Sequence, residues 1–338
     1  MQNSQLPKKF KTAFFGRNKV INEVYAQGRR AQIAELTDLY PHVVDLANFQ
    51  EHAPHLRDLE AIFTTWFMPS LQPEQLDLLP SLKAVFYAAG TVKPFALPFL
   101  ERGITVVSAW QANAIPVAEF TSAQIVLSMK GYFRNAREYT GPAYWNAGGF
   151  QGPGNYGGTV ALLGAGAIGR KVIEYLKPYH LRIVAFDPFL GEARAAELGI
   201  AKVSLEEAFE QGCVVSNHLA NIPETRKMLH GGLFAKMRRD ATFINTGRGA
   251  TVDEPGLIEV LRARPDLTAL LDVTWPEPPA EDSPFFTLPN VQTTTHIAGS
   301  ANDETVRLAD YCLEEFEAWA CGRPLRYAVS LEMLKRMA

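Results

Sequence analysis

Residues 159–169 read Thr-Val-Ala-Leu-Leu-Gly-Ala-Gly-Ala-Ile-Gly, an apolar run followed by glycines in the pattern G-x-G-x-x-G. This order predicts a strand, a tight turn and the start of a helix. Gly164 permits the turn, Gly166 lets the backbone approach a pyrophosphate, and Gly169 lets the helix pack close to the strand. The loop Gly164–Gly169, with Ala167 and Ile168 at the helix start, is therefore our candidate phosphate cradle of a dinucleotide site.

The next apolar run, residues 182–186, ends at Asp187, where the dinucleotide fold places an acid on the adenosine ribose. The same carboxylate would repel a 2′-phosphate, and no Arg follows it in Pro-Phe-Leu, so we expect NAD rather than NADP. The alternative, a structural turn with Asp187 as a helix cap, is disfavoured by the strand-turn-helix context. A nucleotide P-loop is also disfavoured, because Arg170-Lys171 replaces its Lys-Ser/Thr pair.

Composition bounds the possible functions. A chain of 338 residues suits two domains. The formal net charge is -3, and no basic run extends beyond residues 8–11, so we expect a small-molecule partner and neither nucleic acid nor membrane. Three cysteines without metal-ligand spacing predict no disulfide framework and no metal site. With no signal-like N-terminus or membrane span, we expect a soluble protein of the reducing cytoplasm.

Apolar runs separated by helix-length intervals predict parallel α/β layers on both sides of the glycine loop. The predicted strands are 12–15, 43–46, 61–63, 84–87 and 104–107, then 159–163, 182–186, 213–217, 241–245, 268–272 and 291–295. Pro116 is typical of a first helical turn, so we expect a joining helix over 117–136 that Gly141-Pro142 ends. The spacing of Ser300 and Asp303 predicts a capping box before a final helix.

Ionisable residues gather where the later strands end, the edge at which open α/β sheets bind ligands. These are the stretches 245–249, 271–273, 276–278 and 295–299. Together with the glycine loop, and with residues 82–90, 112–119 and 223–226, they resemble the D-isomer-specific 2-hydroxyacid dehydrogenases. The resemblance implies a Rossmann NAD-binding domain, residues 112–299, inserted into a flavodoxin-like substrate domain, residues 1–111 and 300–338, with NAD and substrate in the cleft between them.

The chemistry of a 2-keto acid explains two of these side chains. Arg248 offers a planar fork of donors that can anchor a carboxylate beside a carbonyl. A histidine side chain, with an unperturbed pKa near ~6.5, can exchange a proton with the carbonyl oxygen as hydride reaches carbon, and His296 is placed for that. The resemblance adds Glu277, whose carboxylate would hold the imidazole and favour its protonated form. We therefore expect Arg248, Glu277 and His296 to be catalytic, with Arg248 and His296 also binding substrate.

The resemblance implies roles for further residues. Asp272 would lie beside the nicotinamide, and the cofactor pocket would be bordered by Thr246, Gly247, Ala298 and Gly299. His218 and Leu219 would line its adenosine side. Ala89 and Gly90 would offer backbone N–H groups to the substrate carboxylate. Relatives pair through the dinucleotide domain, so we expect a homodimer.

The substrate is less defined. The family often continues from the equivalent of Gly90 into Val-Asp, whereas this chain reads Thr-Val-Lys-Pro. Glyoxylate, hydroxypyruvate and larger 2-keto acids stay open, as do phosphoglycerate and phosphite dehydrogenases. The chain ends soon after His296, which disfavours a feedback-regulated phosphoglycerate dehydrogenase. An NAD(H)-responsive, corepressor-like binding protein is the alternative outside catalysis.

Overall fold

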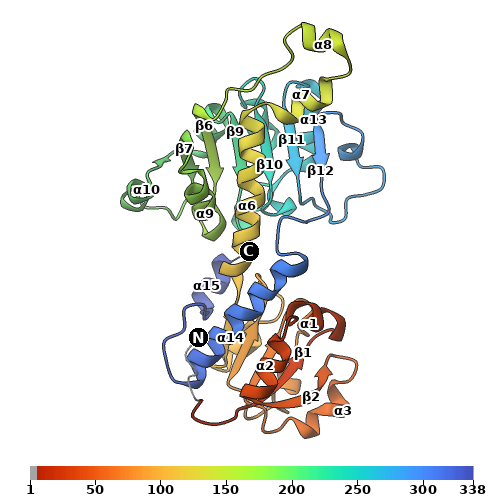
Figure 1. Cartoon of the computed structure of the whole chain (residues 1–338), viewed down its shortest axis with the longest axis vertical. Coiled ribbons are helices and arrows are strands. Elements are labelled where there is room, and N and C mark those ends of the chain that lie inside the picture. The colour runs from red at the N-terminus through yellow and green to blue at the C-terminus, as the bar shows by residue number, and fades with distance from the viewer. Residues whose placement is uncertain (1–5, 338) are drawn as a thin grey trace. The chain divides into compact units, whose positions relative to one another are not determined.

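The computed structural model describes residues 6–337. They form two compact units, each built on its own parallel sheet (Figure 1). The first unit contains the described residues up to Asn113 and the segment Ser300–Met337, and the second contains Ala114–Gly299. The chain is thus two doubly wound α/β sheets, which confirms the predicted fold class. Over residues 6–337, no helix has the length and apolar character needed to cross a membrane.

The sheet of the first unit has five parallel strands in the order β2-β1-β3-β4-β5, the flavodoxin-like order. The strands are β1 (Lys11–Phe15), β2 (Asp38–Val44), β3 (Ala61–Thr64), β4 (Ala84–Tyr87) and β5 (Thr105–Ser108). The predicted run at 43–46 proved to be only the end of β2. This is an edge strand with largely exposed residues, so most of it lacks an apolar pattern. It stops where the Asp45 side chain accepts the N–H groups of Ala47 and Asn48.

Helices cover both faces of this sheet. They are α1 (Asn18–Val24), α2 (Arg29–Leu36), α3 (Phe49–His52), η1 (Ala53–His55), α4 (Pro73–Leu76), α5 (Leu97–Glu101), η5 (Asn302–Thr305), α14 (Val306–Ala320) and α15 (Leu331–Arg336). The long helix α14 packs against α1, α2 and β4. Its Phe316 ring lies 5.1 Å from that of Phe63 and 5.5 Å from that of Phe86, centroid to centroid. The C-terminal part of the chain therefore completes the core that the N-terminal part begins.

The start of that final helix corrects a prediction. Ser300 is not its cap, because the Ser300 N–H donates to the Asn113 side chain and the helical turn begins at Asn302. The Glu304 carboxylate instead accepts the N–H of Ala301 at 3.0 Å. The carboxylate that reaches back is therefore one residue later than the spacing of Ser300 and Asp303 suggested.

The sheet of the second unit has seven parallel strands in the order β12-β11-β10-β9-β6-β7-β8. The strands are β6 (Tyr156–Leu163), β7 (His180–Phe186), β8 (Ala201–Lys202), β9 (Val214–Asn217), β10 (Thr242–Asn245), β11 (Thr268–Leu271) and β12 (Val291–Thr293). The chain reverses direction across the sheet between β6 and β9, as in dinucleotide-binding folds. Strand β8 was not predicted, because two exposed residues at a sheet edge form no apolar run.

The second unit carries the remaining helices. They are α6 (Trp110–Met129), α7 (Tyr132–Glu138), α8 (Pro142–Asn146), α9 (Ala167–Leu176), α10 (Glu192–Leu198), α11 (Leu205–Gln211), η2 (Pro223–Thr225), α12 (Gly231–Ala235), η3 (Gly249–Thr251), α13 (Glu254–Ala263) and η4 (Pro284–Phe286). Helix α6 begins in the residues assigned to the first unit, since the boundary after Asn113 falls within it.

The predicted helix over 117–136 was wrong at both ends. Helix α6 starts at Trp110 and keeps Pro116 in its interior, because its buried face outweighs the lost N–H. It ends before Gly131, whose φ of 76° turns the chain into the separate helix α7. Gly152 packs against this corner, where an added Cβ would overlap the Met129 carbonyl oxygen, so no side chain fits there. Pro142 opens α8 rather than ending a helix.

Candidate active site

The glycine loop joins β6 to α9 with the contacts expected of a phosphate cradle. Gly164 has a φ of +98°, and a Cβ on it would meet the His218 carbonyl oxygen at 2.9 Å. A Cβ on Gly169 would overlap the Gly164 carbonyl oxygen. The helix can pack this close to the turn only because residue 169 is a glycine and has no side chain. Gly166, by contrast, is exposed and faces open space just before α9. The first turn of α9 is therefore open to a diphosphate.

Asp187 lies at the end of β7, next to this loop. Its two carboxylate oxygens accept the N–H groups of Ala165 and Phe189, each at 2.8 Å. The first bond ties the acid directly to the glycine loop. Each oxygen keeps a second acceptor site, so the half-buried carboxylate can still receive a ribose hydroxyl. The contacts that fix Asp187 leave its predicted role chemically feasible.

His218 follows β9 and lies on the other side of the glycine loop, where its carbonyl contacts Gly164. Its Nε2 lies 3.0 Å from the Ser216 hydroxyl. Burial lowers the pKa of His218 to about 4, so the ring is neutral at physiological pH. Its buried Nδ1 has no partner within residues 6–337. A shielded polar atom beside an open glycine loop fits a bound ligand in this place.

Arg248 lies in the turn between β10 and η3. Its backbone carbonyl accepts the Thr251 hydroxyl at 2.8 Å, and one guanidinium nitrogen donates to the Gly247 carbonyl at 2.7 Å. Burial lowers the pKa of Arg248, while the negative charge of Glu277 opposes that shift. A guanidinium stays charged at any physiological pH. A partly desolvated cation at this strand end is a strong attractor for a small anion.

His296 and Glu277 form the hydrogen-bonded pair that the resemblance implies. The distance from His296 Nδ1 to Glu277 Oε1 is 2.7 Å, and the two side chains are 47% and 40% exposed. Pairing through Nδ1 leaves Nε2 on the other side of the ring, accessible to a solvent-borne molecule. The His296 backbone has a φ of 60°, unusual for a side chain of this size. Such a conformation at a strand end marks a turn whose shape serves the side chain.

Asp272 explains how this turn is held. It is 3% exposed, and its carboxylate accepts the Thr294 hydroxyl at 2.6 Å and the N–H groups of Ile297 at 2.8 Å and Ala298 at 3.0 Å. Its backbone carbonyl accepts the His296 N–H at 3.0 Å. Asp272 therefore anchors the His296 turn on both sides of the histidine, a contact set that the sequence did not reveal.

The other expected cofactor residues lie at this same edge, between the ends of β9, β10 and β12. Leu219, Thr246, Gly247 and Ala298 are buried, and Gly299 is half-buried. The Thr246 hydroxyl lies 2.8 Å from that of Thr121 on α6. Ala167 and Ile168, both half-buried, open helix α9. All the expected catalytic and cofactor residues thus belong to the second unit, where they lie in strand-end loops and in the first turn of α9.

Ala89 and Gly90 lie in the first unit, just after β4. The Ala89 N–H donates to the Tyr87 carbonyl at 2.9 Å, and Ala89 is buried. This corrects our expectation that the Ala89 N–H is offered to a ligand. Gly90 is half-buried, and its carbonyl accepts the Ser108 hydroxyl at 2.6 Å. Ser108 also donates to the Ala89 carbonyl at 3.0 Å. Ala89 shapes the turn, and Gly90 is the residue that faces outward from it.

Sequence reasoning missed a buried polar network beneath Arg248. Asn217 Nδ2 donates to the side chains of Asn245 and Thr251, at 3.0 and 2.8 Å, and Asn245 accepts the Gly247 N–H at 3.1 Å. The only available signal was two Asn residues ending neighbouring apolar runs. Amides at such positions hold strand-end turns together, because their donors and acceptors satisfy several backbone groups.

Two side features have ordinary roles. The ring nitrogen of His52 lies 2.9 Å from the Tyr40 hydroxyl, and the His52 ring stacks on that of His42. Within the described residues, no group of three or more His, Cys, Asp or Glu side chains could hold a metal ion. Large apolar side chains that follow the strands differ in burial. Tyr87 and Met68 belong to the core of the first unit, whereas Phe67 is 55% exposed under Arg17 and Trp275 is 50% exposed under Arg226.

Comparison with known proteins connects this site to one family. The model of the D-isomer specific 2-hydroxyacid dehydrogenase NAD binding domain matches residues 123–298, more than half of the chain. D-3-Phosphoglycerate dehydrogenases of Archaeoglobus fulgidus and Bacillus subtilis are 32% and 30% identical, each over 70% of this chain. Those matches cover only 44% and 45% of the relatives, so the chain spans less than half of their length.

A solved structure supports the same fold. A protein from Thermus thermophilus is 26% identical, with a TM-score of 0.69 over 95% of this chain and 100% of its own. The match to the NAD binding domain contains the glycine loop, Asp187 and all three residues of the Arg248, Glu277 and His296 set. The predicted family and its cofactor, NAD, are confirmed. The chain belongs to the D-isomer specific 2-hydroxyacid dehydrogenase family, and its second unit is the NAD-binding domain of that family.

Proposed function

We propose that the protein is an NAD-dependent oxidoreductase that interconverts a D-2-hydroxy acid and the corresponding 2-keto acid. The observation that carries this proposal is the 2.7 Å pair of His296 and Glu277 close to a partly buried, charged Arg248. A proton exchanger and an anion anchor are what reduction of a carbonyl next to a carboxylate requires. Family membership supports the same reaction class.

In this proposal each residue has a defined task. Arg248 binds the substrate carboxylate and polarises the neighbouring carbonyl. His296 delivers a proton from Nε2 to the oxygen on C2 during reduction and receives it during oxidation. Glu277 holds the ring at Nδ1. Asp272 keeps the turn in place, and Gly90 offers a backbone N–H to the substrate.

Bound NAD would supply or accept the hydride. The residues that fit the cofactor are Gly164, Gly166, Ala167, Ile168 and Gly169 for the diphosphate and Asp187 for the adenosine ribose. His218 and Leu219 flank its adenosine part, and the nicotinamide side is bordered by Thr246, Gly247, Asp272, Ala298 and Gly299. Open space over Gly166 and the unpartnered His218 Nδ1 support this assignment.

In this proposal the substrate is a 2-keto acid, and the group attached beyond its keto carbon is not yet assigned. Among the names of similar proteins, D-3-phosphoglycerate dehydrogenase recurs, which favours a phosphorylated hydroxy acid as one candidate. A broader panel is therefore the right test. NADH consumption is measured with glyoxylate, hydroxypyruvate, pyruvate, phenylpyruvate and 3-phosphohydroxypyruvate, each with the unmodified protein, Arg248→Ala and Arg248→Lys.

We expect turnover of at least one of these acids. Arg248→Ala abolishes it, and Arg248→Lys restores little, because an ammonium lacks the planar fork of donors. Tight NADH binding without turnover of any 2-keto acid would overturn the enzyme proposal and favour the corepressor-like alternative. In that case a peptide partner would bind equally well to the Arg248→Ala protein.

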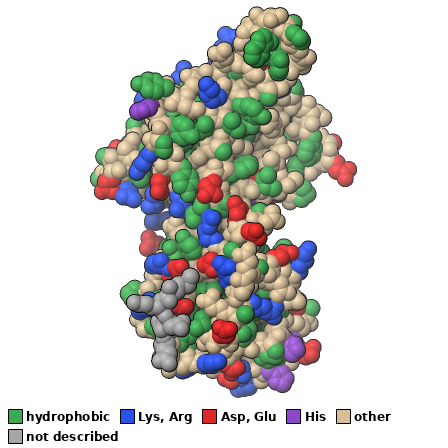
Figure 2. Space-filling model, in the orientation of Figure 1, with side chains coloured by type: hydrophobic (Ala, Val, Ile, Leu, Met, Phe, Trp, Pro, Cys, Tyr) green, Lys and Arg blue, Asp and Glu red, His purple; other side chains and the backbone are tan. Residues whose placement is uncertain are grey.

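We further propose that the protein is a homodimer of the reducing cytoplasm. All three cysteines are free, which suits such a compartment. Large aromatic side chains lie exposed around α7, α8 and the start of β6, among them Trp145 at 73% and Tyr156 at 79%. Figure 2 shows hydrophobic side chains on the projection that contains α8 in Figure 1. Exposed aromatic residues in this number mark an interaction surface.

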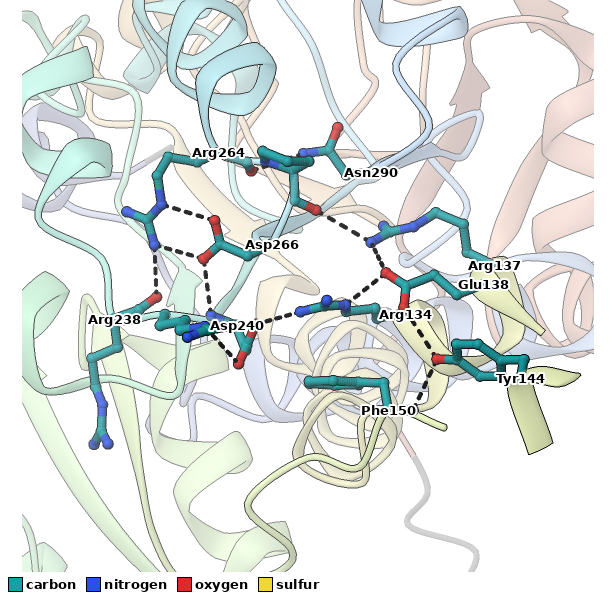
Figure 3. A network of polar contacts seen from close by, with 12 residues as sticks. Arg134, Arg137, Glu138, Tyr144, Phe150, Arg238, Asp240, Arg264, Asp266 and Asn290 are labelled. Atoms are coloured by element: carbon teal, nitrogen blue, oxygen red, sulfur yellow. Dashed lines mark hydrogen bonds and ion pairs between the residues drawn. The ribbon is translucent and has the colours of Figure 1, made fainter. Parts of the chain in front are cut away.

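The segment that carries these residues is held firmly by charges (Figure 3). Arg134 on α7 pairs with Asp240, which precedes β10, and with Glu138, which also accepts the Tyr144 hydroxyl at 3.1 Å. The Tyr144 oxygen in turn accepts the Phe150 N–H at 2.8 Å. A rigid, aromatic projection suits a second copy of the chain. Sedimentation of Trp145→Asp tests it: we expect a dimer to become monomeric, and an unmodified protein that is already monomeric would contradict the proposal.

A further inference from the structure

Glu254, the first residue of α13, is not used in the mechanism above, although it lies beside the loop that carries Glu277. Its Oε1 accepts the backbone N–H of Trp275 at 2.6 Å. An acid in a first helical turn usually stabilises the helix through the dipole and the free N–H groups. Here the carboxylate reaches to another loop instead.

A second contact brings the same two segments together. A Cβ on Gly249 would overlap both the carbonyl carbon and the carbonyl oxygen of Thr274, so the backbone at Thr274 rests directly on this glycine. Within the loop, the Thr274 hydroxyl donates to the Pro276 carbonyl at 2.9 Å. The loop 274–278 therefore packs on the turn 248–254 through the contact of Thr274 with Gly249, and the hydrogen bond from the Trp275 N–H to Glu254 lies next to that contact.

The packing of loop 274–278 bears on the position of Glu277. Trp275 is two residues before Glu277, whose carboxylate holds His296 at 2.7 Å and whose charge acts on Arg248. Glu277 is 40% exposed, and apart from His296 no residue of the described chain forms an ion pair with it. Its position depends on the backbone of its own loop. A shift of about 1 Å in such a group costs of the order of 100-fold in rate.

We propose that Glu254 is a positioning residue that, through the N–H of Trp275, sets Glu277 against His296. The inference rests on the proposed function, because it concerns the same proton-exchanging pair. Burial raises the pKa of Glu254 to about 7 and the Trp275 N–H opposes that shift, so the carboxylate occupies a water-poor place while still being held by the loop.

The experiment compares Glu254→Leu, which removes the acceptor, with Glu254→Gln, which keeps an amide oxygen at the same point. Glu259→Leu is the matched control, because Glu259 lies on the exposed face of the same helix. Amide hydrogen exchange of the Trp275 N–H is measured without ligands. kcat, KM and the Kd of NADH are measured with the best substrate of the panel.

We expect Glu254→Leu to speed exchange at Trp275 and to lower kcat about 10-fold or more, with the Kd of NADH unchanged. Glu254→Gln keeps both the protection and most of kcat, and Glu259→Leu behaves as the unmodified protein. A general loss of helix stability would instead affect exchange along α13 and leave the kcat of the folded protein unaltered.

Two results would overturn the inference: an unprotected Trp275 amide in the unmodified protein, or Glu254→Leu with faster exchange and unchanged kcat. The first can be measured even when a variant does not fold. An unmodified protein without turnover of any 2-keto acid would overturn the proposed function, while the exchange measurement would still decide whether Glu254 holds the loop.

Discussion

Both sheets are parallel and doubly wound, but the loops at their carboxyl edges carry different kinds of polar group. In the second unit the edge carries ionisable side chains: Arg248, Asp272, Glu277 and His296. In the first unit, the turns that follow β3, β4 and β5 are held by hydroxyls, with Thr65 donating to Ala88 and Ser108 to Gly90. The fold brings loops to an edge, and the residues in each loop decide whether that loop offers ionisable side chains or backbone donors.

The largest expected effect on turnover lies at the carboxyl edge of the second unit's sheet. His296→Gln should lower kcat by about 100-fold or more, because glutamine fills similar space but cannot exchange a proton at neutral pH. The Kd of NADH should stay the same. Steady-state kinetics and NADH fluorescence check this, with His180→Gln, an exposed histidine of the same unit, as the control. Turnover at the unmodified rate in His296→Gln would remove the histidine from the mechanism.

A smaller effect is expected at the cofactor acid. Asp187→Asn keeps the shape and an acceptor for the Ala165 N–H but removes the charge that repels a 2′-phosphate. The preference for NADH over NADPH should fall by about 10-fold, which is near 1.4 kcal/mol. The ratio of kcat/KM values for the two cofactors measures it. Equal use of both cofactors by the unmodified protein would refute the assigned role of Asp187.

At the turn that follows β4 in the first unit, a substitution should alter KM for the keto acid rather than kcat. Ser108→Ala removes the hydroxyl that fixes the carbonyls of Ala89 and Gly90. One such hydrogen bond is worth about 1 kcal/mol, so KM for the keto acid should rise about 5-fold with kcat unaltered. Ser81→Ala, at the other end of β4, is the control. A fall in kcat without a rise in KM would show that the two edges are not divided in this way.

The smallest effect concerns stability and pH. The folded-state pKa of Glu254, about 7, is above the ordinary value of 4.5, because burial disfavours the charged form. The folded state therefore binds this proton more tightly, and stability is lost as pH rises from 4.5 through 7. Allowing for solvent screening, Glu254→Gln should gain about 1 kcal/mol at pH 8 and nothing at pH 4.

Thermal unfolding of the two proteins at both pH values measures this difference. We expect the Tm of Glu254→Gln to exceed that of the unmodified protein by about 2–4 °C at pH 8 only. A larger gain at acid pH would have the wrong sign and would show that burial does not raise the pKa of this group.

Sequence alone located most of the strands, the glycine loop and the strand-end ionisable residues, because buried parallel strands are apolar runs and ligands bind where they end. It misplaced both ends of helix α6, whose start lies before Pro116 because burial outweighs the signal of that proline. It also assigned the Ala89 N–H to a ligand, whereas a local turn uses it. Contacts between loops, such as Asp272 with the His296 turn, leave no periodic pattern in a sequence.

The most direct test follows the hydride itself. The protein is supplied with NADH deuterated at C4 of the nicotinamide and with the best 2-keto acid of the panel, and the product is analysed by NMR. We predict a D-2-hydroxy acid carrying deuterium at C2, formed by the unmodified protein and not by Arg248→Ala. NADH that binds but transfers no deuterium to C2 of any 2-keto acid would contradict the assignment of Arg248, Glu277 and His296 as a catalytic set.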